Sequence, residues 1–162
     1  MIRILSLAAA LVIFAIPVEA HDYQIGSVHI ERPWARATPK GAEVGGGYMK
    51  ITNRGTTPDR LVGGSVAVAE RMVIHAMTMD GNIMKMRALD QGLELKPGAT
   101  VDLAPESLHL MFEGLREPLV QGQRIKGSLT FERAGTIEIE YAVEGMGAKS
   151  PPPEGQNSQH NH

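Results

Sequence analysis

The chain has 162 residues, a formal net charge of −2 and no cysteine. A chain of this length can form a single domain with its own core, and the near-neutral charge without a basic run argues against a nucleic-acid partner. Because thiols are absent, disulfides and thiolate metal sites are excluded, and any transition metal must be bound by His, Met or carboxylate side chains.

Residues 1–20 have the features of a secretory signal peptide. Arg3 supplies the positive start, residues 4–16 form an apolar run, and residues 18–20 supply the cleavage pattern. We therefore expect the mature chain to begin at His21 and the protein to lie in the periplasm. The apolar run is shorter than the roughly 20 residues that a membrane span needs, and no later segment comes near that length, so no span is expected in the mature chain.

Residues 21–147 are predicted to form one all-β domain. Short segments that alternate between apolar and polar residues, or are rich in β-branched side chains, are separated by turn signals such as Asp80-Gly81-Asn82. The expected strands are residues 25–30, 47–52, 60–66, 71–76, 83–87, 100–103, 109–113, 124–131 and 136–143. About nine strands at this spacing predict a β-sandwich or barrel, and a helical turn is considered only within residues 66–72.

Residues 148–162 are predicted to form a disordered tail. Lys149-Ser150-Pro151-Pro152-Pro153 is a stiff polyproline stretch, and residues 154–162 are wholly polar. This tail ends in His160 and His162.

Histidine and methionine recur two residues apart in the expected strands. His75-Ala76-Met77 and His109-Leu110-Met111 each pair an imidazole with a thioether, and Met84-Lys85-Met86 adds two thioethers between them. Residues i and i+2 of a strand project from the same face, so nitrogen and soft sulfur can converge on one patch. A thioether carries no charge and competes poorly for zinc or calcium, but it suits the polarizable cuprous ion. The pattern therefore predicts a Cu(I) site, and its neutral ligands favour a carrier over a catalytic centre.

The chain ends suggest a second kind of copper site. After cleavage, His21 would offer an α-amino nitrogen and an imidazole, a chelate that favours Cu(II). His160 and His162 add two imidazoles on a flexible tether. We hypothesise that the tail captures Cu(II) near the strand site.

One spaced motif resembles that of a known family. His75, Met86 after ten intervening residues, and then His109-Leu110-Met111 resemble the pattern of the periplasmic copper chaperones called PCuAC. Other segments that resemble this family are residues 34–39, 52–55, 59–63 and 92–114, and the resemblance extends over residues 24–147. Twenty-two residues separate Met86 from His109, one more than is usual in the family, and we expect the extra residue in the loop 89–92.

The resemblance implies a cupredoxin-like β-sandwich with Greek-key topology that binds Cu(I) at one end. The ligands that it implies are His75, Met86, His109 and Met111. It also implies a monomeric chaperone that passes copper to an apo-protein, either the cytochrome c oxidase subunit with the binuclear copper centre or a thiol copper chaperone.

Three further methionines, Met77, Met79 and Met84, are not required by the family pattern. We expect them to pack beside the site, and the alternative is a transient landing point during copper transfer. Trp34 is expected to anchor the core.

Other classes of function remain open at this point. In a copper enzyme, His21 would pair with another histidine as a chelating brace, and in a scaffold or adhesion β-sandwich the histidines and methionines would have no metal role. Zinc or nickel capture is disfavoured because the paired residues include no carboxylate or thiolate. The sequence contains no nucleophile, base and acid constellation and no phosphate loop, so no enzyme is predicted.

Overall fold

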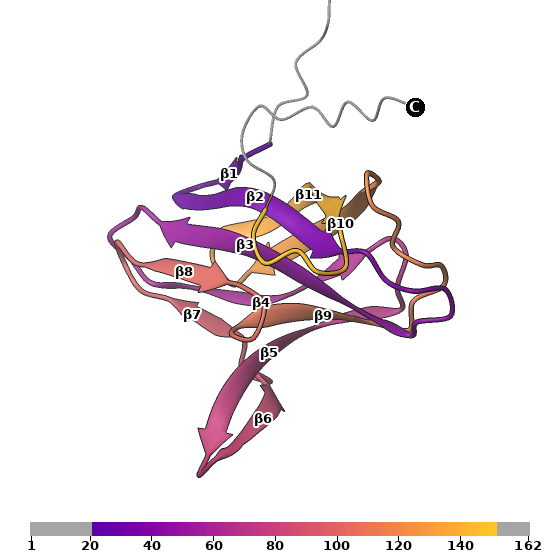
Figure 1. Ribbon diagram of the computed structural model, residues 1–162. Helices are drawn as coiled ribbons and strands as arrows, with labels where there is room; N and C mark the ends of the chain where they lie inside the picture. The colour runs from indigo at the N-terminus through magenta and orange to yellow at the C-terminus, as the bar shows by residue number, and fades with distance from the viewer. Residues whose placement is uncertain (1–20, 152–162) are drawn as a thin grey trace, which may run out of the picture.

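The computed structural model describes residues 21–151, so the expected signal peptide and residues 152–162 of the tail lie outside the described range. Eleven β-strands make up the domain (Figure 1). They are β1 (Tyr23–Ile25), β2 (Val28–Arg36), β3 (Val44–Asn53), β4 (Asp59–Val66), β5 (Arg71–Asp80), β6 (Ile83–Ala88), β7 (Leu93–Leu95), β8 (Thr100–Leu103), β9 (His109–Glu113), β10 (Arg124–Phe131) and β11 (Gly135–Glu144). Within residues 21–151, no helix has the length and apolar character needed to cross a membrane.

The strands form one hydrogen-bonded path that folds back on itself into two layers. Its order is β6-β5-β9-β3-β2-β11-β10-β4-β7, with β1 paired to β2 and β8 to β3. Strands β4 and β5 are far apart in this order but pack against each other, since a Cβ on Gly64 of β4 would lie 2.6 Å from the terminal methyl of Met72 on β5. The Tyr141 hydroxyl of β11 donates to Met72 Sδ at 3.8 Å. The layers therefore enclose one core, as in a β-sandwich.

Aromatic rings fill the core between β9 and β11. The rings of Phe112 and Tyr141 pack edge to face with centroids 5.2 Å apart, and both residues are fully buried. A Cβ on Gly47 of β3 would lie 2.4 Å from the Phe112 ring. Glycine at this strand position therefore lets the ring lie against the backbone.

Strand β2 joins the two layers through a bulge. Its register with β3 shifts between Glu31 and Trp34, and Arg32 has a φ of 43°. Beyond this irregularity, residues 34–36 also pair with the parallel strand β11. The bulge thus lets one strand take part in both layers. Trp34 is buried, as expected for an anchor, and its ring contacts that of Tyr48 with centroids 4.5 Å apart.

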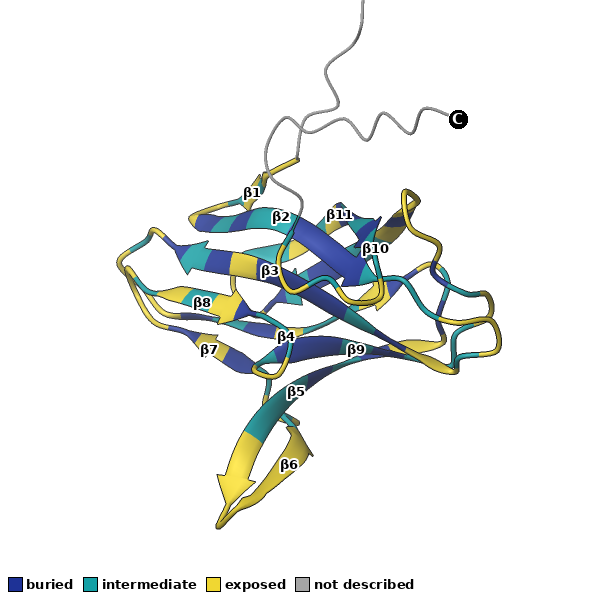
Figure 2. Cartoon of the chain, in the orientation of Figure 1, coloured by how far each residue is buried: buried dark blue, intermediate teal, exposed yellow. Residues whose placement is uncertain are grey.

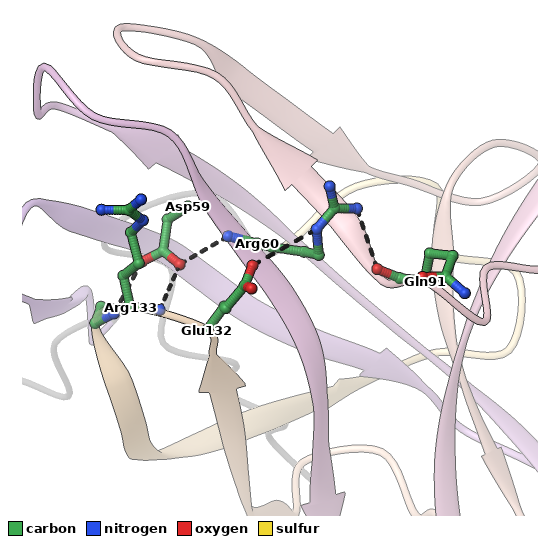
Figure 3. Close-up of polar contacts among 6 residues, drawn as sticks. Asp59, Arg60, Gln91, Glu132 and Arg133 are labelled. Carbon is green, nitrogen blue, oxygen red and sulfur yellow. Dashed lines mark hydrogen bonds and ion pairs between the residues drawn. The ribbon is translucent and has the colours of Figure 1, made fainter.

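A buried carboxylate fixes the start of β4 against the turn between β10 and β11 (Figure 3). Asp59 Oδ1 accepts the backbone N–H groups of Arg60 at 2.7 Å and Arg133 at 2.9 Å, and Oδ2 accepts that of Ala134 at 3.0 Å. The guanidinium of Arg60 lies 3.7 Å from the exposed carboxylate of Glu132. Asp59 is 8% exposed, so little water reaches this corner. Its carboxylate oxygens therefore serve as the acceptors that these backbone N–H groups need.

Most expected strands are confirmed, although some run beyond their expected bounds, as β2 does to Arg36 and β5 to Asp80. Three further differences have local causes. The expected strand 25–30 is split at Gly26, whose φ of 55° turns the chain so that β1 and β2 form a hairpin. The short strand β7 was not predicted, because its three residues are too few for a periodic pattern. Residues 67–70 form turns and bends, without the helical turn that was considered.

Part of the expected tail lies against the domain. The carbonyl oxygen of Ala148 accepts a hydrogen bond from Arg36 Nε at 2.7 Å. Residues 149–151 line a small pocket that also includes Trp34. The prediction of disorder for the remaining residues, 152–162, lies outside the described range.

Replacing Asp59 with alanine should lower the free energy of unfolding by about 2–4 kcal/mol, because backbone N–H groups in a part-buried corner lose their acceptor. Chemical denaturation of the purified protein measures this change. Glu132→Ala is the matched control, since it removes only an exposed ion-pair partner and should cost less than about 0.5 kcal/mol. Equal losses in the two variants would contradict the role of Asp59.

Candidate metal centre

Strands β5, β6 and β9 carry the predicted histidines and methionines on one face. His75 of β5 lies directly opposite His109 of β9 and Ala88 of β6. Residues directly opposite in an antiparallel pair share a face, as do residues two apart in one strand. This surface, called the His/Met face below, therefore carries His75, Met77, Met79, Met84, Met86, His109 and Met111.

The opposite face of β9, and of the part of β5 that pairs with it, belongs to the core. Ile74 lies opposite Leu110, and Met72 lies opposite Phe112, and all four side chains are buried. The alternation of the two strands thus separates the core from the His/Met face.

The two histidine rings lie close together, and they present different nitrogen atoms to a metal. Their centroids are 5.6 Å apart, and the rings are nearly perpendicular, at 87°. His109 Nδ1 lies 2.9 Å from the carbonyl oxygen of Ser107. Since a carbonyl only accepts, Nδ1 must carry the proton of the neutral ring, and Nε2 retains the lone pair that a metal needs.

One ring nitrogen of His75 has no hydrogen-bond partner in the described part of the chain. Its Nδ1 is buried and makes no hydrogen bond to the described residues. Such an orphaned group costs about 1–3 kcal/mol in a folded protein, and a bound metal or other ligand would offset that cost.

The surroundings favour the neutral form of His75. Burial lowers the pKa of the His75 ring, the neighbouring His109 lowers it further, and Glu113 opposes both effects. Glu113 itself forms an ion pair with Arg71 across the β5–β9 pair, so its charge is partly compensated. A neutral imidazole is the form that binds a metal.

Two of the predicted sulfur ligands flank the histidines. Met111 follows His109 by two residues on β9, lies opposite Val73 and is partly exposed. Met86 lies opposite Met77 on the β5–β6 hairpin and is 50% exposed. The four predicted ligands are thus brought onto one face of three adjacent strands, with the histidines toward the body and Met86 toward solvent.

The hairpin of β5 and β6 projects from the body of the domain (Figure 1), and most of its surface is exposed (Figure 2). Met79 and Met84 lie opposite each other near its tip and are 62% and 54% exposed. These two side chains therefore add little to the packing that was expected of them.

Of the other predicted ligands, His21 lies within the described residues, and it is not brought to this face. His21 lies beside Tyr23, with ring centroids 6.5 Å apart, and lines a pocket formed with residues of β4, β10 and β11. Among the described residues lining this pocket, His21 is the only histidine, so the partner that a histidine brace needs is missing there. His160 and His162 lie outside the described residues.

Within residues 21–151, no three His, Cys, Asp or Glu side chains gather closely enough to hold a metal ion. A site built on His75 and His109 would therefore draw its further ligands from thioethers.

Two features near the site were not found from the sequence. The Ser107 carbonyl that orients His109 is a backbone group, so the residue types of the sequence give no signal for it. Tyr48 lies over Gly46, since a Cβ there would be 2.4 Å from its hydroxyl oxygen, and Gly46 lies opposite Met111. The glycine run of residues 45–47 was the available signal for close approach by an aromatic ring.

Solved structures of PCuAC domains have the same fold. The copper-bound PCuAC domain from PmoF2 is 29% identical, covers 77% of this chain and 98% of that domain, and has a TM-score of 0.66. The solution structure of CuI-DR1885 from Deinococcus radiodurans is 22% identical, covers 77% of this chain and 81% of that one, and has a TM-score of 0.60, a likeness of fold alone. These similarities confirm the expected cupredoxin-like β-sandwich.

Sequence comparison identifies the family. "Putative lipoprotein Lxx21020" of Leifsonia xyli subsp. xyli is 28% identical over 120 residues, which cover 74% of this chain and 71% of that protein. Residues 28–143 match the family described as "LpqE-like: Putative lipoprotein LpqE-like". Since the match extends over most of the chain, the protein belongs to the LpqE-like family.

Proposed function

We propose that this protein is an exported copper chaperone that binds Cu(I) through His75, Met86, His109 and Met111. The observation that carries this proposal is the direct pairing of His75 with His109 on a face that also carries the thioethers of Met86 and Met111. The buried Nδ1 of His75, which has no hydrogen-bond partner among residues 21–151, adds an atom that a bound ion would satisfy.

The donor set fits a monovalent soft cation. Two neutral imidazoles and two thioethers contribute no negative charge, so they would compensate a divalent ion poorly. Cu(I) accepts both donor types, and the similar structures from PmoF2 and Deinococcus radiodurans are a copper-bound form and a CuI form of those proteins. Copper is here the cargo of the protein.

Unequal exposure of the ligands supports release by ligand exchange. His109 is 7% exposed, whereas Met86 is 50% exposed. An incoming thiolate or imidazole would reach the metal from the side of Met86 and replace this thioether first. The buried His109 and the partly buried His75 would be displaced last, which keeps the copper bound to protein throughout the exchange.

The recipient that we propose is a copper protein of the cell envelope, the cytochrome c oxidase subunit with the binuclear copper centre or a thiol copper chaperone. Export is supported by the leader-like residues 1–20 and by the lipoprotein description of the family. Such a recipient must offer the copper ion ligands that are stronger than a thioether.

The Cu(I) site is tested by anaerobic titration against a chromogenic Cu(I) chelator. The unaltered protein should bind one tight equivalent at the strand site. His109→Ala and Met86→Leu should each weaken binding by at least about 10–100-fold, because even residues that only orient a metal ligand cost that much when removed.

Met146→Leu provides the matched control for this titration. Met146 is 63% exposed and follows β11, a strand that pairs with none of β5, β6 and β9, so its replacement should leave the affinity unchanged. Retention of the tight equivalent in His109→Ala would contradict the proposed site, and absence of competition by the unaltered protein would favour the scaffold function.

The His75 ring of the metal-free protein should take up its proton at a lower pH than the ordinary value of about 6.5, because burial and His109 lower its pKa. Near that value the unfolded chain therefore binds the proton more strongly than the folded chain does. The contribution of His75 to stability is therefore present above the ordinary pKa and is lost as the pH falls below it. An NMR titration of the ring, assigned with His75→Gln, measures this, and a midpoint above 6.5 would contradict it.

Delivery is tested by mixing the Cu(I)-loaded protein with the metal-free soluble domain of the oxidase subunit, without oxygen. After the two proteins are separated by chromatography, copper should be found on the oxidase domain. The same domain with its copper-binding cysteines replaced should receive none. Copper that stays with the loaded protein in both mixtures would exclude this recipient and leave the binding site itself untouched.

A further inference from the structure

We propose that the distal part of the β5–β6 hairpin holds a second soft-metal site, formed by the thioethers of Met77, Met79 and Met84, which takes Cu(I) or Ag(I). The choice of copper as its cargo rests on the proposed function. The site itself rests on the register and exposure of the hairpin.

The register gathers these sulfur atoms on two neighbouring rungs of the hairpin. Met79 lies directly opposite Met84, and Met77 lies directly opposite Met86. Side chains directly opposite have Cβ atoms about 4.5–5.5 Å apart, and successive rungs on one face are about 7 Å apart. Three rotatable bonds allow each methionine side chain to bring its sulfur atom toward a shared ion.

The turn fixes this register. Gly81 has a φ of 63° and precedes Asn82 in a two-residue loop, with Asp80 and Ile83 paired on either side. A positive φ at the first of two loop residues is typical of the type II′ turn that suits hairpins. The turn, as well as the hydrogen bonds between the strands, therefore keeps Met79 opposite Met84 and Met77 opposite Met86.

The two faces of the hairpin differ in chemistry. Thr78 lies opposite Lys85 and Ala76 lies opposite Arg87, on the face away from the thioethers. On that face too, Asp80 forms an ion pair with Lys85. The thioether face of the hairpin consequently has neutral, soft donors without a carboxylate, a set that selects monovalent soft cations over divalent hard ones.

Packing does not account for the distal methionines. Met79 is 62% exposed and Met84 is 54% exposed, on a hairpin that projects into solvent (Figure 2). A methionine that fills a gap in a core is buried. A two-stranded hairpin is only marginally stable on its own, and an ion bound across its strands would hold them together.

The proposed second site lies one rung from the first. Met77 belongs to the distal cluster and lies opposite Met86, which is a proposed ligand beside the histidines. An ion on the distal cluster can therefore move to the strand site by exchanging one thioether for the next, without leaving the His/Met face.

The test uses the mature protein with carbon-13 in its methionine methyl groups, titrated with Ag(I) and followed by NMR. Silver is a diamagnetic substitute for Cu(I), and the chain has no cysteine to compete for it. The first equivalent should shift the methyl signals of Met86 and Met111. The second should shift those of Met77, Met79 and Met84.

Two variants separate the two sites. Met79→Leu combined with Met84→Leu conserves side-chain volume and should abolish the second set of shifts while keeping the first. Met86→Leu should weaken the first site and leave the shifts of Met79 and Met84 in place. Met146→Leu is the control for loss of an exposed methionine outside the hairpin and should change neither set.

Each outcome addresses one proposal. Signals of Met79 and Met84 that stay fixed through two equivalents, while Met86 shifts, would overturn the second site and leave the strand site standing. Shifts of Met79 and Met84 without any at Met86 or Met111 would support the second site and contradict the proposed strand site. The signals of buried Met49, which reports on the folded core, show whether each variant is folded.

Discussion

The antiparallel register between β5 and β9 is the constraint on which the candidate metal centre depends. It places His75 opposite His109 and, one position along, Ile74 opposite Leu110. Because the side-chain period of a strand is two, a slip of β5 by one residue would carry His75 into the core and Ile74 into solvent. Burial of Ile74 and Leu110 therefore fixes the register that keeps the two imidazoles together on the His/Met face. The packing of the core thus determines which side chains this face carries.

The face divides into a part within the body of the domain and a part on the projecting hairpin. The histidines lie where β5 is flanked by both β9 and β6, and the distal thioethers lie where β5 has β6 alone as a neighbour. The candidate nitrogen donors and Met111 are thus held by a packed sheet, and the other candidate sulfur donors are presented on a ribbon of two strands. A carrier needs both properties, since it must retain its cargo in transit and expose it to a recipient.

Much of this arrangement could be predicted from residue patterns. Alternation and turn residues gave the strands 100–103, 109–113 and 124–131 with the bounds that the structure has. The spacing of His75-Ala76-Met77 also predicted donors on a common face. Local pattern has this power because a strand fixes the direction of every second side chain, whatever it pairs with.

Other features depend on pairing between distant segments and had no local signal. Nothing within residues 71–80 or 109–113 states that His75 lies opposite His109. Asp59 likewise has its role only because the turn at Arg133 folds onto it. The single strand expected over 25–30 was wrong because the conformation of Gly26 outweighed the apolar alternation around it.

The projecting hairpin also has a chemical cost. Exposed methionine is readily oxidised to its sulfoxide, which replaces an apolar thioether with a polar group, and repair requires dedicated reductases. Met79 and Met84 are open to solvent for more than half of their surface, so small oxidants reach the same sulfur atoms that a metal would. The redox state of the surrounding compartment therefore sets how many of these methionines remain thioethers, the form that binds soft metals.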